Sequence, residues 1–177
     1  MREIEPPIWR RLLIPASITF HRFHKIVQAA FGWQDYHLFR FELEDREICI
    51  PDDEYPNPLP QHNAKRVKID EVLPEKPDMV YAYDFGDGWE HQVIVEGTEV
   101  LVVEKPIAFC LAGARCRPPE DVGGVAGYYD FLEIIADAEH EEHDQMLTWA
   151  EKDTGGRKYD PEYFYLPEVN RALARVH

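Results

Sequence analysis

Cysteine, long apolar runs and positive charge are all scarce in this chain. Its 3 cysteines among 177 residues are too few for a secreted disulfide scaffold. No apolar run approaches the roughly 18 residues that a membrane helix needs, and the N-terminus lacks the apolar region of a signal peptide. Lysine and arginine number 19 against 34 acidic residues, and the resulting net charge of −15 repels phosphate backbones and anionic membranes. We therefore expect a soluble, cytoplasmic protein that does not bind membranes, and the net charge disfavours nucleic acid as a partner.

The composition that remains is that of one globular domain. Hydrophobic residues make up 45% of the chain and aromatic residues 12%, which is enough for a packed core. A chain of 177 residues is the size of one ordinary domain, and no shift in composition marks a boundary. We expect a single domain over residues 1–177.

The clearest element is a helix between Thr19 and Gly32. Apolar side chains recur within it at helical spacing, the Thr19 hydroxyl can cap its first turn, and Gly32 ends it. A hairpin is indicated by two strand-like runs on either side of Gly86-Asp87-Gly88, since a tight turn needs the positive φ that glycine adopts. The other expected elements are strands at 8–14, 37–43 and 48–50, helices at 128–136, 140–150 and 168–176, an exposed loop at 51–63 and irregular structure at 110–127.

Strands early in the chain and helices late in it are typical of the α+β class. We expect an antiparallel or mixed β-sheet packed against helices.

Five sequence blocks occur in a fixed order, and together they are specific. The blocks are Pro6–Arg11, Phe31–Trp33 with His37–Phe39, Tyr83–His91, Pro118–Gly124 with Gly127-Tyr128, and His140–His143. With these blocks the chain resembles the plasmid pRiA4b ORF-3-like family, which is also labelled as TnpR-type passenger proteins of insertion elements. The resemblance implies a single α+β domain and an association with mobile elements, but no defined activity and no recombinase active site.

The chain departs from the family pattern in two places. Members begin with a further strand before the Pro6–Arg11 block, and only five residues precede it here. Either the start of the chain is truncated or the strand is missing, and a missing strand would leave a sheet edge open for pairing with another chain. Members also place cysteines where Arg117 and Val122 stand here, which weakens a thiolate metal site in this loop.

A metal site is one hypothesis for the histidines near residue 140. His140 and His143 have the i, i+3 spacing that shares one face of a helix, and a third ligand has to come from His91, Asp87 or Glu120. Imidazole with carboxylate suits zinc or manganese. A metal-dependent hydrolase would use these residues, with Glu120, Asp121 or Glu141 as candidate catalytic groups. The alternative is an acidic helix start with no ligand role.

The Asp84–His91 turn has two interpretations. Asp84, Asp87 and Glu90 with His91 can bind a cation or act as acid and base. The alternative is turn chemistry, in which the carboxylates accept backbone hydrogen bonds at the hairpin tip.

One basic segment stands out in the acidic chain. Arg10, Arg11, Arg22 and Lys25 lie near aromatic residues, as in a groove for a single nucleic-acid strand. We favour the alternative that they neutralise the protein's own acids and shield a sheet edge. Because no catalytic signature is complete, our leading hypothesis is a binding or accessory domain that acts through a protein partner. The metal-dependent hydrolase is the first alternative and nucleic-acid binding the second.

Overall fold

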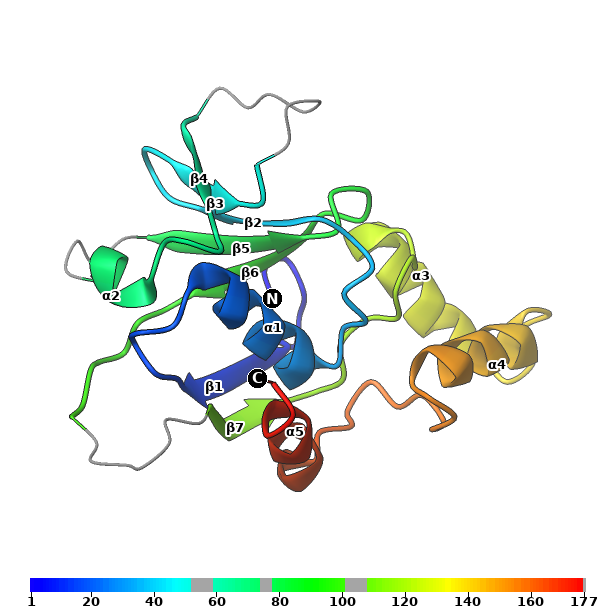
Figure 1. Ribbon diagram of the computed structural model, residues 1–177. Helices are drawn as coiled ribbons and strands as arrows, with labels where there is room; N and C mark the ends of the chain where they lie inside the picture. Colours follow the sequence, from blue (N-terminus) through cyan, green and yellow to red (C-terminus); the bar gives the residue numbers. More distant parts are fainter. Residues whose placement is uncertain (52–58, 74–77, 101–107, 177) are drawn as a thin grey trace.

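The computed structural model describes residues 1–51, 59–73, 78–100 and 108–176. It confirms the α+β class, with α1 lying between a five-stranded sheet and a two-stranded sheet (Figure 1). The strands are β1 (Trp9–Leu13), β2 (Phe39–Glu42), β3 (Glu47–Cys49), β4 (Gln61–Asn63), β5 (Met79–Tyr83), β6 (Trp89–Val93) and β7 (Phe109–Ala114). The helices are α1 (Phe20–Phe31), α2 (Ile69–Val72), α3 (Gly124–Ala136), α4 (His143–Asp153) and α5 (Leu166–Leu173).

Helix α1 begins and ends where the sequence predicts. The Thr19 hydroxyl accepts a hydrogen bond from the Arg22 N–H, and Gly32 takes a left-handed φ of 83° at the end. Phe20 and Phe23 on its buried face pack against Phe41 of β2, with ring centroids 5.0 and 5.1 Å apart. The helix therefore covers the inner face of the larger sheet.

The larger sheet has the order β4-β3-β2-β5-β6, and only the β3–β4 pair is parallel. The predicted hairpin is confirmed, since β5 and β6 pair from Met79↔Val93 to Tyr83↔Trp89. This arrangement brings the start of β2 beside the end of β5, with Phe39 opposite Tyr83.

Two strands lie where we expected none. The segment 110–127 was expected to be irregular, but Phe109–Ala114 forms β7 and pairs antiparallel with β1. Alanine and glycine have little strand propensity, and the partner strand lies about a hundred residues away, so no local pattern indicates this pairing. The expected loop at 51–63 contains β4, whose Gln-His-Asn sequence is equally uncharacteristic of a strand, while residues 52–58 lie outside the described residues.

The helical placement expected for His140 is wrong. Helix α4 starts at His143, and the residues from Asp137 to Glu142 form a turn. Side chains hold this turn: Asp137 Oδ1 accepts a hydrogen bond from Glu139 N at 3.0 Å, and His140 Nδ1 accepts one from Glu142 N at 3.1 Å. Such side-chain bonds compete with helix formation. None of the helices in the described ranges has the length and apolarity to cross a bilayer.

Two histidines are part of the core. The His24 ring stacks on Phe39 with the ring centroids 3.6 Å apart. Its Nδ1 lies 2.7 Å from the Tyr81 hydroxyl, and its Nε2 lies 2.7 Å from Asp35 Oδ1. His91 Nδ1 lies 3.2 Å from the Tyr81 carbonyl oxygen, and its Nε2 accepts a hydrogen bond from the Trp33 indole at 3.4 Å. Burial lowers the pKa of His24 to about 4 and that of His91 to about 3.

The buried histidines predict a loss of stability in mild acid. In the unfolded chain both imidazoles take up protons near pH 6.5, whereas in the folded protein they do so only near pH 4 and pH 3. Each should lower the free energy of unfolding by about 1.4 kcal/mol per pH unit below pH 6. Urea unfolding between pH 7 and pH 5 measures this slope. His91→Gln should reduce the pH dependence of the free energy of unfolding by the contribution of one histidine. An unchanged pH dependence would contradict the lowered pKa of His91.

Candidate functional site

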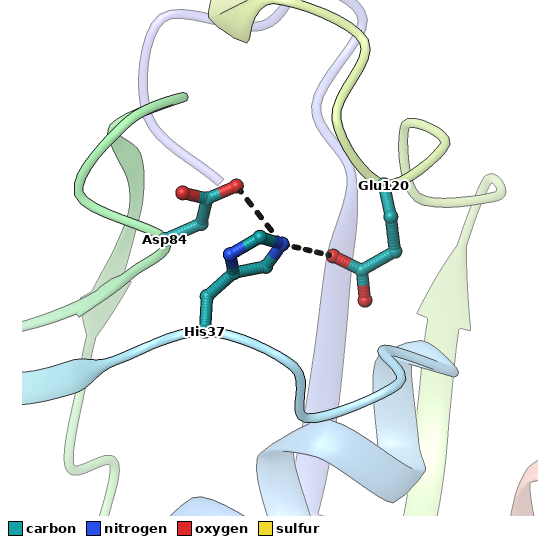
Figure 2. Close-up of side chains that lie close together, drawn as sticks. All are labelled: His37, Asp84 and Glu120. Atoms are coloured by element: carbon teal, nitrogen blue, oxygen red, sulfur yellow. Dashed lines mark ion pairs between the residues drawn. The ribbon is translucent and has the colours of Figure 1, made fainter.

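Three side chains from distant parts of the sequence meet at one end of the larger sheet. His37 lies two residues before β2, Asp84 directly follows β5, and Glu120 lies before α3. Figure 2 shows His37 between the two carboxylates, with its Nε2 3.5 Å from Asp84 Oδ2 and 3.9 Å from Glu120 Oε2. One ligand atom from each residue lies within 4.8 Å of the others, and no other group of three such side chains occurs in the described part of the chain.

Asp84 is oriented by its own turn. It has a φ of 54°, and its Oδ1 accepts hydrogen bonds from Gly86 N at 3.0 Å and Asp87 N at 3.3 Å. The prediction that this carboxylate holds the turn is confirmed. Because Oδ1 is occupied in this way, Oδ2 faces His37. The sequence Asp-Phe-Gly-Asp thus places one carboxylate oxygen in the site.

Glu120 is only 5% exposed and has polar partners on its Oε1. The backbone N–H of Gln34 donates to Oε1 at 2.7 Å, and the Tyr83 hydroxyl donates to the same atom at 3.3 Å. Burial raises the pKa of Glu120. Burial and the neighbouring Glu120 carboxylate together raise the pKa of Tyr83. The ionised form of Glu120 is therefore less favourable than that of an exposed carboxylate.

His37 supplies a buried nitrogen that has no hydrogen bond. Its Nε2 is inaccessible to solvent, yet it makes no hydrogen bond of acceptable geometry. Three carboxylates surround it, because the exposed Asp121 places Oδ1 only 3.2 Å away. A buried polar atom normally has a partner, so this nitrogen calls for an explanation. A cation held between the imidazole and the carboxylates provides one.

A buried ion pair supports the Glu120 side of the site. Arg117 donates to both oxygens of Asp153 on α4, at 2.7 and 3.2 Å, and its guanidinium lies over the Trp33 ring. Asp153 also accepts a hydrogen bond from the Gln34 side chain at 2.7 Å. The ion pair therefore holds Gln34 in place through its side chain, and the Gln34 backbone N–H binds Glu120.

The Asp84–Gly88 turn is pressed against the loop before α3. Asp87 Oδ2 accepts a hydrogen bond from Gly123 N at 3.1 Å. Gly124 has a φ of 70°, and a Cβ atom added there would lie 2.6 Å from the Asp87 carbonyl oxygen. Only glycine fits this position without displacing one of the two segments. The contact therefore sets the distance between Asp84 and Glu120.

The structure brings together only part of the predicted residue set. Glu120 and Asp121 line the site, and Asp87 ties its two loops together. His91 is in the core, whereas His140 and Glu141 lie in the turn before α4. His143 starts that helix with its Nδ1 3.3 Å from the Ile134 carbonyl oxygen. Metal binding by His91, His140 and His143 stays a prediction.

The residue that sequence reasoning missed is His37. It belongs to no spaced motif, and its partners lie 47 and 83 residues further along the chain. The available signal was that His37, Asp84 and Glu120 each fall in a different block of the family resemblance.

Comparison with known proteins decides the family. Residues 1–168 match the family described as plasmid pRiA4b ORF-3-like protein. The chain belongs to this family. An uncharacterized protein of Sinorhizobium fredii, y4hQ, is a relative with 36% identity over 173 residues, which cover 96% of this chain and 85% of the relative.

A solved relative has the same fold. The crystal structure of MM3350, a protein of unknown function from Methanosarcina mazei Go1, matches with a TM-score of 0.79 at 36% identity, over 95% of this chain and 92% of that one. Both relatives of this pRiA4b ORF-3-like protein are described without a function, so function has to be inferred from the site itself.

Substitution of Gly124 tests the contact that sets the site. Gly124→Ala should lower the free energy of unfolding by more than about 3 kcal/mol, because left-handed strain of roughly 1–2 kcal/mol adds to the overlap with Asp87. Gly156→Ala is the matched control, since Gly156 has a φ of 89° and nothing within 4 Å of the added Cβ. Denaturant unfolding of both variants measures the difference, and equal losses would contradict the close approach.

Proposed function

We propose that the protein binds one divalent transition-metal ion through His37, Asp84 and Glu120, with Asp121 at the solvent side. The observation that carries the proposal is the buried His37 Nε2, which lacks a hydrogen bond although three carboxylates lie within 4 Å. A second support is the burial of Asp84 and Glu120, because buried carboxylates require a compensating positive charge.

The donor set favours particular ions. One imidazole with carboxylates suits Mn²⁺, Fe²⁺ or Zn²⁺, and the site lacks the thiolate and thioether ligands that select Cu⁺. Donor atoms that share one ion at about 2.1 Å lie at most about 4.2 Å apart. The three donor atoms lie within 4.8 Å of one another, so closure needs only a small side-chain movement.

The cluster of His37, Asp84 and Glu120 suits metal-dependent hydrolysis better than His91, His140 and His143 do. A bound ion with a free coordination position lowers the pKa of water, and Asp121 is an exposed carboxylate beside it. His37 and Asp84 would then hold the ion in place of His140 and His143. Glu120 and Asp121 keep the roles that the hydrolase hypothesis considered for them.

Metal titration tests the proposal. Mn²⁺ should bind with a stoichiometry of one, as measured by electron paramagnetic resonance of the free ion. His37→Gln and Glu120→Gln should each weaken binding by at least about tenfold, because even the loss of a group that only supports a ligand typically has an effect of this size. His143→Gln should leave binding unchanged. Loss of binding in His143→Gln with retention in Glu120→Gln would instead favour the histidines near α4.

Thermal unfolding separates a binding role of Glu120 from a purely structural one. Since burial raises the pKa of Glu120, its charge opposes folding at neutral pH, and the sign of the effect favours a neutral replacement. Glu120→Gln should therefore match or exceed the melting temperature of the wild-type protein in chelator. It should also lose the increase that Mn²⁺ gives the wild type. A melting temperature well below the wild-type value in chelator would assign Glu120 a structural role.

A second candidate function is protein binding through the β1–β7 sheet. These two strands expose the large apolar side chains of Trp9, Phe109 and Leu111, of which Leu111 is 53% exposed. Exposed large apolar side chains can mark a site of protein binding. β1 and β7 pair only with each other in the described part of the chain, so this sheet also supplies the open edges expected for self-association.

Sedimentation velocity tests the second candidate. The protein should self-associate with rising concentration, and Leu111→Glu should return it to a monomer by placing a charge in the apolar contact. A wild-type protein that stays monomeric throughout would count against a second copy as the occupant.

A further inference from the structure

We infer that the open side of the His37–Asp84–Glu120 site takes an uncharged ligand that presents a carbonyl oxygen or a nitrogen donor, and that it rejects phosphate esters. The inference rests on the proposed metal binding and adds the class of ligand. It follows from the charge that surrounds the ion and from the direction in which the site is open.

The groups that face the ion carry an excess of negative charge. Asp84, Glu120 and Asp121 are carboxylates, and His37 binds a metal only as the neutral imidazole. Three carboxylates against one divalent ion leave a net charge of −1. A phosphate dianion therefore approaches a centre that repels it, while a neutral donor meets no such penalty.

The neighbouring guanidinium groups do not reverse this balance. Arg117 is 4% exposed, and it donates to the Gly32 carbonyl oxygen as well as to Asp153. Arg40 lies over the Phe85 ring, with its Nε 2.6 Å from Glu42 Oε1. Both cations are thus held by partners of their own, and neither is available to a phosphate.

The site opens on the side of Asp121. The Asp121 side chain is 69% exposed and that of His37 27%, whereas those of Asp84 and Glu120 are only 7% and 5% exposed. A ligand therefore reaches the ion past the Asp121 carboxylate. This one residue contributes most to the repulsion of an anion and can be changed while three ligands remain.

Ligand titration of the Co²⁺-loaded protein tests the inference. With protein in excess over Co²⁺, imidazole should change the visible absorption bands at concentrations where methylphosphonate does not. Asp121→Asn should raise the affinity for methylphosphonate relative to imidazole by roughly fivefold or more, the effect of one unit charge a few ångströms away in a wet site. Asp70→Asn on α2 is the matched control, because it makes the same charge change on a different element and should leave the ratio unaltered.

The outcomes separate the two proposals. Failure of Co²⁺ to bind at all overturns both the metal site and its ligand class. Bound Co²⁺ that takes methylphosphonate as readily as imidazole, or a ratio that Asp121→Asn leaves unchanged, overturns the ligand class alone.

Discussion

The contact between the Asp84–Gly88 turn and the Gly123-Gly124 segment determines the geometry of the candidate site. Asp84 belongs to the hairpin of the larger sheet and Glu120 to the loop before α3, and no strand pairing joins these two segments. Gly124 allows the Asp87 carbonyl oxygen to approach closely, and the Asp87 side chain binds Gly123 N. Close packing against Asp87 therefore explains the glycine at position 124.

Several charged side chains are buried near this contact. Arg117 and Asp153 satisfy each other, so their burial is balanced. Asp84, Glu120 and His37 lack such a balance, because two buried carboxylates face one imidazole whose Nε2 has no hydrogen bond. Groups that reduce stability in the absence of a ligand are common at functional sites, where binding restores the lost free energy. This imbalance distinguishes the cluster from the buried histidines His24 and His91, whose ring nitrogens have partners in the core.

Local patterns predicted the elements that local interactions determine. Helix α1 follows from the Thr19 cap, the apolar spacing and Gly32, and the β5–β6 hairpin follows from its turn. Strand β7 could not be predicted, because its Ala-Gly-Ala sequence becomes a strand only through pairing with β1. The start of α4 was misplaced because side-chain bonds of Asp137 and His140 replace the first helical turn. In the site, Asp84 and Glu120 were recognised as candidates, whereas His37 joins them only through the tertiary fold.

Anomalous X-ray diffraction from crystals grown with Mn²⁺ tests the central claim most directly. The account predicts one anomalous peak within about 2.0–2.4 Å of His37 Nε2 and of one oxygen each from Asp84 and Glu120. A Mn²⁺ peak beside His140 and His143, or an empty site in which the His37 ring donates to a carboxylate as an imidazolium, would contradict it.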